Sequence, residues 1–260
     1  MFAERDLSDE LATVRERHAP DALVLDCERD FETLDPAVAE DLLLLTDGLE
    51  LLAYDRAWLP ADAPDVLTAL TGEDLTVGTP GDGAVAWTRQ TDPPVVLVKP
   101  RVEGSPESFV DFLLAEALVQ VGGDDPEHFL GFFRDEYPAF AAAAERFDGA
   151  ETYQLAAACF EAYRGLATRE VFAGWDGDLP GLSDAWTEAG EWLAPRLEAL
   201  SGEIARGETS VPTAAELACS GVKHDVDVPA PFGALDTAAY REYGPEYAVQ
   251  WVEKTLAETV

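Results

Sequence analysis

Glu116 is the carboxylate whose neighbours in this sequence are least suited to a charge. It lies in FLLAEALVQV, residues 112–121, which is apolar on nearly every side of a helix, so most faces of this helix are expected to be buried. A buried carboxylate is costly unless it is paired, or has a raised pKa and a use. Gln120 follows one turn later on the same face. Glu116 and Gln120 are therefore candidate pocket residues, and the structural alternative is a narrow wet stripe on a mostly buried helix.

The segment around Glu116 resembles part of the zincin-type metallopeptidase arrangement. In that arrangement a hairpin and an edge-like strand precede a core helix that carries H-E-x-x-H, in which two histidines bind zinc and the Glu acts as base. Here Ala115 and Val119 occupy the two ligand positions, and neither side chain can bind zinc. The resemblance covers about residues 75–121 and keeps only Glu116, so it implies at most a metal-less relic of a hydrolase fold.

Basic residues are concentrated near the expected sheet. Arg89, Lys99 and Arg101 are three of only 17 basic residues in the chain. Lys99 and Arg101 alternate on an expected strand, so both can face the same way and hold an anionic ligand such as a carboxylate or phosphate. The alternative is ion pairing with the acidic surface.

The run from Lys223 to Asp227 is the main candidate for a cation site. His224 is followed by carboxylates at Asp225 and Asp227, and this combination can help to bind a divalent cation. Such clusters also arise by chance, because 52 of 260 residues are Asp or Glu. The spacing provides no full ligand set, so we expect neither a metal nor another cofactor.

The charge of the chain restricts its environment and its partners. Lys and Arg total 17 against 52 Asp and Glu, a formal net charge of −35, which would strain a compact state in dilute salt. At molar salt the Debye length is only ~3 Å and the repulsion is screened. The composition is typical of halophiles and argues against nucleic-acid binding, which needs cations opposite phosphates. With neither a signal peptide nor a membrane-spanning run, we expect a cytoplasmic protein without membrane contact.

The pattern predicts an α+β fold that is predominantly α-helical. A small three-stranded antiparallel-type sheet is expected at about 75–102, flanked by an N-terminal helical part and a C-terminal helical bundle. We expect a single globular domain over 1–260, with a possible division into 1–149 and 150–260. The expected strands are 75–79, 84–88 and 95–99, with a hairpin loop at 80–83. The expected helices are 8–18, 35–53, 62–70, 105–121, one from 125 that is kinked or split at Pro138, 151–172, 183–206 interrupted at Pro195, 212–226, and 236–256 broken at 244–245.

Three stretches resemble an uncharacterised, haloarchaea-restricted protein family of unknown function. They are Met1–Leu25 (MFAERDLSDELATVRERHAPDALVL), Gln90–Gly122 with TDPPVVLVKPRVEGSPESFVDFLLAEALVQVG, and Glu216–Tyr240 with ELACSGVKHDVDVPAPFGALDTAAY. The resemblance runs over nearly the full length. It implies a haloarchaeal source and a single architecture, and it implies no activity, substrate or catalytic residue.

We therefore expect a non-enzymatic interaction or scaffold protein of a halophilic cytoplasm, because the sequence contains no complete catalytic constellation. Its partner would be an unknown protein or a second copy of the chain. The alternative is a ligand-binding or degenerate zincin-like domain with Glu116 in a pocket and Lys99 or Arg101 on an anion.

Overall fold

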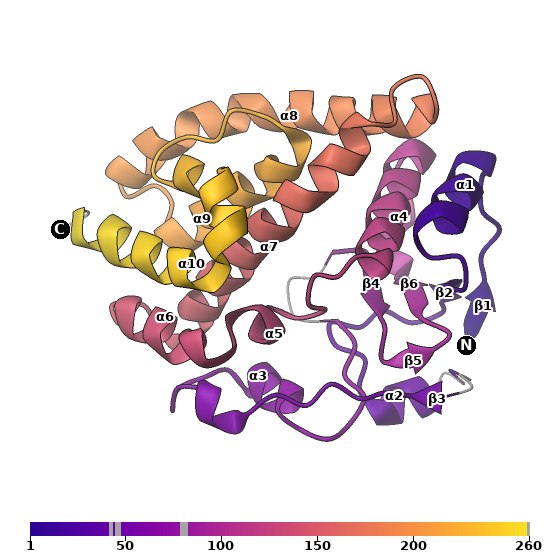
Figure 1. Cartoon of the computed structure of the whole chain (residues 1–260), viewed down its shortest axis with the longest axis horizontal. Coiled ribbons are helices and arrows are strands. Elements are labelled where there is room, and N and C mark those ends of the chain that lie inside the picture. Colours follow the sequence, from indigo (N-terminus) through magenta and orange to yellow (C-terminus); the bar gives the residue numbers. More distant parts are fainter. Residues whose placement is uncertain (42–43, 45–47, 79–82, 259–260) are drawn as a thin grey trace. The chain divides into compact units, whose positions relative to one another are not determined.

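The computed structural model describes residues 1–41, 44, 48–78 and 83–258 (Figure 1). The α-helices are α1 (Asp9–His18), α2 (Pro36–Asp41), α3 (Asp65–Leu70), α4 (Glu107–Gly122), α5 (Phe129–Phe133), α6 (Tyr137–Ala143), α7 (Gly149–Ala173), α8 (Pro180–Ala205), α9 (Val211–Gly221) and α10 (Ala238–Glu258). The strands are β1 (Phe2–Glu4), β2 (Leu23–Cys27), β3 (Gly48–Leu49), β4 (Val85–Thr88), β5 (Thr91–Asp92) and β6 (Val95–Val98). Short 3-10 turns are η1 (Arg56–Trp58), η2 (Pro100–Val102), η3 (Arg134–Glu136), η4 (Val222–His224) and η5 (Phe232–Leu235). The α+β, predominantly helical class is confirmed.

Local capping explains where several of these helices begin and end. The Ser8 hydroxyl accepts a hydrogen bond from the backbone N–H of Leu11 and caps α1. Asp148 and Glu151 form a capping box at the start of α7. Each cap satisfies backbone donors that the first helical turn leaves without a partner. The cap at Ser8 places the start of α1 where the sequence predicts it, whereas α7 begins at Gly149, two residues before the predicted start at Glu151.

The chain forms two units that alternate along the sequence. The first unit comprises residues 1–53, 68–127 and 175–185, and the second comprises residues 54–67, 128–174 and 186–260. The division passes through α8, between Ala185 and Trp186. The expected single domain, with an optional boundary at 149/150, stays a prediction.

A four-stranded sheet in the order β1-β2-β6-β4 is the centre of the first unit. β1 and β4 pair antiparallel with their neighbours, while β2 and β6 run parallel. The sheet is therefore mixed and has four strands instead of the three expected, because β1 and β2 join it from the N-terminus while the strand expected at 75–79 is not part of it. α4 lies against β4 and β6, and α1 packs against α4.

The core of the first unit is built from the strands and the segments that cross them. The side chains of β6, Val95 to Val98, are all at most 2% exposed. A continuous apolar run is typical of a strand that is covered on both faces. Cys27, Phe31, Leu34 and Val77 belong to the same core as Val95 and Leu97.

The second unit is helical and rich in aromatic contacts. α7 packs against α9, η4 and α10. Its core contains a network of rings in tilted and edge-to-face contact, in which Phe132 touches Phe133, Phe160, Tyr163 and Tyr240. Such pairs add to the free energy gained from burial alone.

Two sequence predictions differ from the structure in the N-terminal half. Of the helix expected over 35–53, the structure describes Pro36–Asp41 as α2, and Gly48–Leu49 instead pairs with Thr91–Asp92 as β3 and β5. The intervening residues 42–43 and 45–47 lie outside the described residues. Tertiary pairing overrides helix propensity here, since Gln90 also accepts the backbone N–H groups of Glu50 and Leu52.

The first expected strand is reduced to a single bridge. Of residues 75–79, Val77 alone pairs, with Leu34, in the part that the structure describes. Thr79 and most of the expected hairpin loop, residues 79–82, lie outside the described residues.

The helix breaks expected near prolines agree only in part with the structure. α8 continues through Pro195, whose exposed site lets solvent satisfy the backbone carbonyl that a proline leaves free. The break expected at Pro138 falls earlier, at Arg134, whose φ of 50° ends α5. Pro138 itself lies in the first turn of α6, where its missing N–H costs little. The expected break in α10 is confirmed at Gly244, whose φ is 52°.

None of the described helices combines the length and the apolarity that a membrane span requires.

Candidate functional site

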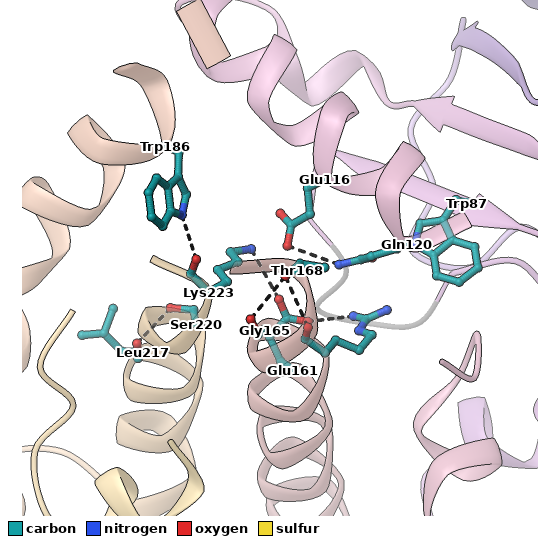
Figure 2. Close-up of polar contacts among 11 residues, drawn as sticks. Trp87, Glu116, Gln120, Glu161, Gly165, Thr168, Trp186, Leu217, Ser220 and Lys223 are labelled. Carbon is teal, nitrogen blue, oxygen red and sulfur yellow. Dashed lines mark hydrogen bonds and ion pairs between the residues drawn. The ribbon is translucent and has the colours of Figure 1, made fainter. Parts of the chain in front are cut away.

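Glu116 takes part in a series of side-chain hydrogen bonds in the first unit. The indole Nε1 of Trp87 donates to Gln120 Oε1 at 2.8 Å, and Gln120 Nε2 donates to Glu116 Oε1 at 3.2 Å. Figure 2 shows Gln120 between Glu116 and the ring of Trp87. Glu116 is 7% exposed. The hydrogen bond from Gln120 orients the Glu116 carboxylate, and Trp87 of β4 holds Gln120 in turn.

Lys99 is a buried cation at the end of β6. Its side chain is fully buried, and Nζ lies 4.8 Å from the centre of the Phe31 ring. A cation over an aromatic face gains electrostatic stabilisation that increases when water is excluded. The cation–π contact with Phe31 is one part of what holds Lys99 in the core.

Arg101 does not share a strand face with Lys99. β6 ends at Val98, and Arg101 lies in the turn η2, so the expected alternation on one strand is wrong. The Arg101 guanidinium binds the carboxylates of Asp30 at 2.8 Å and Glu32 at 2.9 Å. A hydrogen bond from Arg101 lowers the pKa of Asp30. The arginine therefore ties η2 to the loop after β2.

Arg89 closes the end of α4. Its guanidinium donates to the backbone carbonyls of Gly123 and Asp125 and lies 5.4 Å from the centre of the Trp87 ring. These carbonyls belong to the C-cap residue of α4 and to the loop after it, and the helix dipole favours a cation at this end. These contacts give Arg89 a structural role.

Glu127 is a buried carboxylate that the sequence did not single out. Glu127 Oε2 accepts from the backbone N–H of Arg89 at 2.9 Å, and Oε1 accepts from Gln90 Nε2 at 2.8 Å. Burial raises the pKa of Glu127, and these hydrogen bonds only partly oppose that shift. Gln90, 2% exposed, also donates to the carbonyl of Thr76 and to the hydroxyl of Thr88. This polar cluster joins the loop after α4 to the sheet.

His128 is the first residue of the 128–174 segment of the second unit and is buried. It is 5% exposed, and its Nδ1 lies 3.3 Å from the hydroxyl of Tyr54. Burial lowers the pKa of His128 to about 3, and the charge of Arg164 contributes in the same direction. His128 is therefore a neutral imidazole at ordinary pH.

A carboxylate between two cations lies on α7. Glu161 binds Arg164 at 2.7 Å and Lys223 at 3.4 Å, as Figure 2 shows for Lys223. Burial alone would raise the pKa of Glu161, but the charges of Arg164 and Lys223 outweigh it and lower the pKa. A Cβ at Gly165 would lie 3.0 Å from the backbone N of Lys223, so the glycine allows η4 to approach α7 closely. In the sequence, Lys223 stood out only as the first residue of the run from Lys223 to Asp227.

The residues proposed for a cation site are not brought together. His224 Nδ1 lies 3.1 Å from the carbonyl of Trp186, and burial together with Lys223 lowers the pKa of His224 to about 4. Asp225 pairs with Arg169 at 3.4 Å, while Asp227 is exposed. Within residues 1–41, 44, 48–78 and 83–258, no group of three His, Cys, Asp or Glu side chains has an arrangement that could hold a metal ion.

A groove on the second unit lies between α8 and α9. Its volume is about 350 Å³. Arg196, Leu200, Glu203, Thr209, Thr213, Glu216, Leu217 and Ser220 line it. On α9, Thr213, Glu216, Leu217 and Ser220 are spaced as one helix face. The sequence did not predict this groove, because it depends on which faces of two helices remain uncovered.

Trp192 lies on α8 one turn before the groove. It is 68% exposed, and the Arg196 guanidinium is 5.7 Å from the centre of its ring. All six tryptophans belong to the described residues, and Trp192 alone among them is exposed. Tryptophan and arginine are both among the residue types enriched at the energetic centres of protein interfaces.

Comparison with known proteins identifies a family for the chain. Neither a curated protein nor a solved structure matches it. A family model, described as a family of unknown function (DUF7089), matches residues 1–259. The chain therefore belongs to the DUF7089 family.

Proposed function

We propose that this protein is an interaction or scaffold protein of a salt-rich cytoplasm, which binds another protein chain through the surface formed by α8 and α9. The observation that carries the proposal is Trp192, 68% exposed and covered on one side by Arg196. The groove lined by α8 and α9 begins one helical turn away.

The geometry of the surface suits a helix of the partner. Two neighbouring helix faces with a groove between them accept an amphipathic helix that presents side chains at intervals of three and four residues. Leu200 and Leu217 provide the apolar part of the groove, and Glu203, Glu216 and Arg196 provide charges. Burial of the Trp192 indole against such a helix would remove a large apolar surface from water.

The composition supports the proposed environment. A net charge of −35 produces repulsion that molar salt reduces to a range of ~3 Å. In such salt, apolar contacts and close ion pairs still stabilise a complex, whereas long-range attraction does not. An exposed indole is therefore an effective contact group under these conditions.

Site-specific photo-cross-linking tests the proposal. A photoreactive phenylalanine analogue is placed at Trp192, or at Glu198 on another face of the same helix, in a host with molar KCl in its cytoplasm. We expect a discrete adduct from position 192, identified by mass spectrometry as one defined protein chain, and none from position 198. Equal, diffuse adducts from both positions, or none, would contradict the proposed function.

Ligand binding at Glu116 is a second candidate function. It is favoured by the Trp87–Gln120–Glu116 chain, which positions a carboxylate that is 7% exposed. Ala115 and Val119, at the two metal-ligand positions of a zincin helix, have buried apolar side chains, so a ligand would meet Glu116 without a zinc ion held at those positions. A thermal-shift screen of small cationic and neutral ligands with wild type and Glu116→Gln tests it. A ligand that stabilises wild type but not Glu116→Gln would support the site, and equal shifts would exclude it.

A further inference from the structure

Four residues of α8 form a stripe with complementary charges at either side of a small residue. Trp192, Arg196, Ala199 and Glu203 lie within an arc of about 60° on the helix. Trp192, Arg196 and Ala199 are exposed and Glu203 is half-buried. Arg196 and Glu203 are roughly 10 Å apart along the helix axis, and Ala199 lies between them. We call these four residues the α8 stripe.

We propose that the α8 stripe binds the same stripe of a second copy of this chain, with the two α8 helices antiparallel about a two-fold axis near Ala199. This inference rests on the proposed interaction function and specifies its occupant. In a two-fold contact, each residue pair occurs twice with the roles exchanged. Arg196 of each copy then faces Glu203 of the other, and Ala199 lets the two backbones approach.

The groove provides a site for Trp192 in this arrangement. The two-fold axis brings Trp192 of one copy opposite the end of α8 in the other, where Glu203, Thr209 and Thr213 line the groove. α9 follows α8 after a short loop, and its end at Gly221 lies next to Leu193 and Leu197. The two helices are therefore antiparallel, and the groove end at Thr209 and Thr213 lies beside the α8 C-terminus. The indole would therefore meet the partner's groove at this end, beside the loop that joins α8 to α9.

The charges favour a second copy over a generally basic partner. A basic helix would match Glu203 and Glu216, but it would place cations opposite Arg196. A second copy gives Arg196 a carboxylate and Glu203 a guanidinium in the same contact. Repulsion between two chains of net charge −35 opposes this association in dilute salt and is screened at molar salt.

The test is the mass of the full chain in molar KCl, by light scattering after size exclusion, for wild type and charge-reversed variants. Wild type is expected at twice the chain mass of 28.1 kDa. Arg196→Glu and Glu203→Arg should each raise the dissociation constant at least tenfold, because like charges then meet twice. An equimolar mixture of the two variants should restore the dimer, since one chain then carries two Glu and the other two Arg at the contact. The variant carrying both changes should also dimerise.

Glu198→Arg is the matched control, because it makes the same charge change on the same helix outside the stripe. It should dimerise as wild type does, and circular dichroism should show all variants folded. A monomeric wild type, or a dimer that both reversals leave intact, would overturn the inference. If wild type is monomeric while position 192 cross-links to a different protein, the inference fails and the proposed function stands. If position 192 yields no adduct, the interaction function fails as well.

Discussion

The C-terminal end of α4 touches the backbone of α1 at Gly122 and His18. A Cβ atom at position 122 would lie 1.9 Å from the His18 carbonyl oxygen and 2.6 Å from its carbonyl carbon. Backbone atoms cannot move aside as a flexible side chain does, so only glycine fits between these two helices of the first unit.

Gly122→Ala should therefore destabilise the protein, because α1 and α4 would have to separate. Overpacking of this kind costs roughly 1–3 kcal/mol, and more where backbone must shift. Chemical denaturation in molar KCl measures the change in the free energy of unfolding. Gly83→Ala is the control, because a Cβ there has no neighbour within 4 Å. Equal stability of the two variants would contradict the close contact.

Glu161 should stabilise the fold in a pH-dependent manner. Burial opposes its ionisation, but Arg164 and Lys223 outweigh burial and lower the pKa of Glu161. A carboxyl with a lowered folded-state pKa stabilises the fold fully above its unfolded pKa of about 4.3, and this contribution is lost as the pH falls below that value. Glu161→Gln should therefore cost roughly 1–3 kcal/mol at pH 7. The stability difference between wild type and variant, from urea denaturation, should shrink below pH 4. The exposed variant Glu198→Gln should show neither effect.

His128 and His224 should stay neutral in mildly acidic solution. Burial lowers their pKa values to about 3 and about 4, whereas the unfolded chain takes up protons near pH 6.5. Stability should therefore fall as the pH drops below about 6.5, by up to ~1.4 kcal/mol per pH unit for each histidine. Imidazole nitrogen NMR shifts at pH 5.5 provide the measurement. A protonated His128 in the folded protein at that pH would contradict its burial.

The fold should lose stability when salt is lowered. Repulsion among the groups that give the net charge of −35 acts over ~10 Å at 0.1 M salt but over only ~3 Å at 1 M. Circular dichroism across a KCl series should show loss of helix toward millimolar salt. An isosmolar sucrose series controls for solute exclusion, and a spectrum unchanged down to millimolar KCl would refute the prediction.

Helix ends were predictable where a short-range group decides them. Ser8 caps α1, Gly123 follows the last residue of α4, and Gly244 kinks α10. Each of these positions acts through its own backbone or through residues within one turn. β1 and β3 were missed because strands of three and two residues acquire their character from pairing partners elsewhere in the chain.

The contacts of the candidate site residues also fall into two groups, those that a local pattern predicts and those that it does not. Glu116 and Gln120 are four residues apart on one helix, so their hydrogen bond follows from helix geometry. Glu127 contacts Gln90 over 37 residues and Glu161 contacts Lys223 over 62. No local pattern marks such partners, and in a chain with 52 acidic residues a single carboxylate does not stand out. For the same reason, the sequence does not show which faces of α8 and α9 remain uncovered.

The burial of two lysines has a practical consequence for chemical labelling. The chain has three lysines: Lys99 is fully buried, the Lys223 side chain is 14% exposed and paired with Glu161, and Lys254 is exposed on α10. Amine-reactive dyes and surfaces should therefore select the ε-amine of Lys254 among the lysine side chains. Coupling at that amine would give the folded protein a defined attachment point in its last helix.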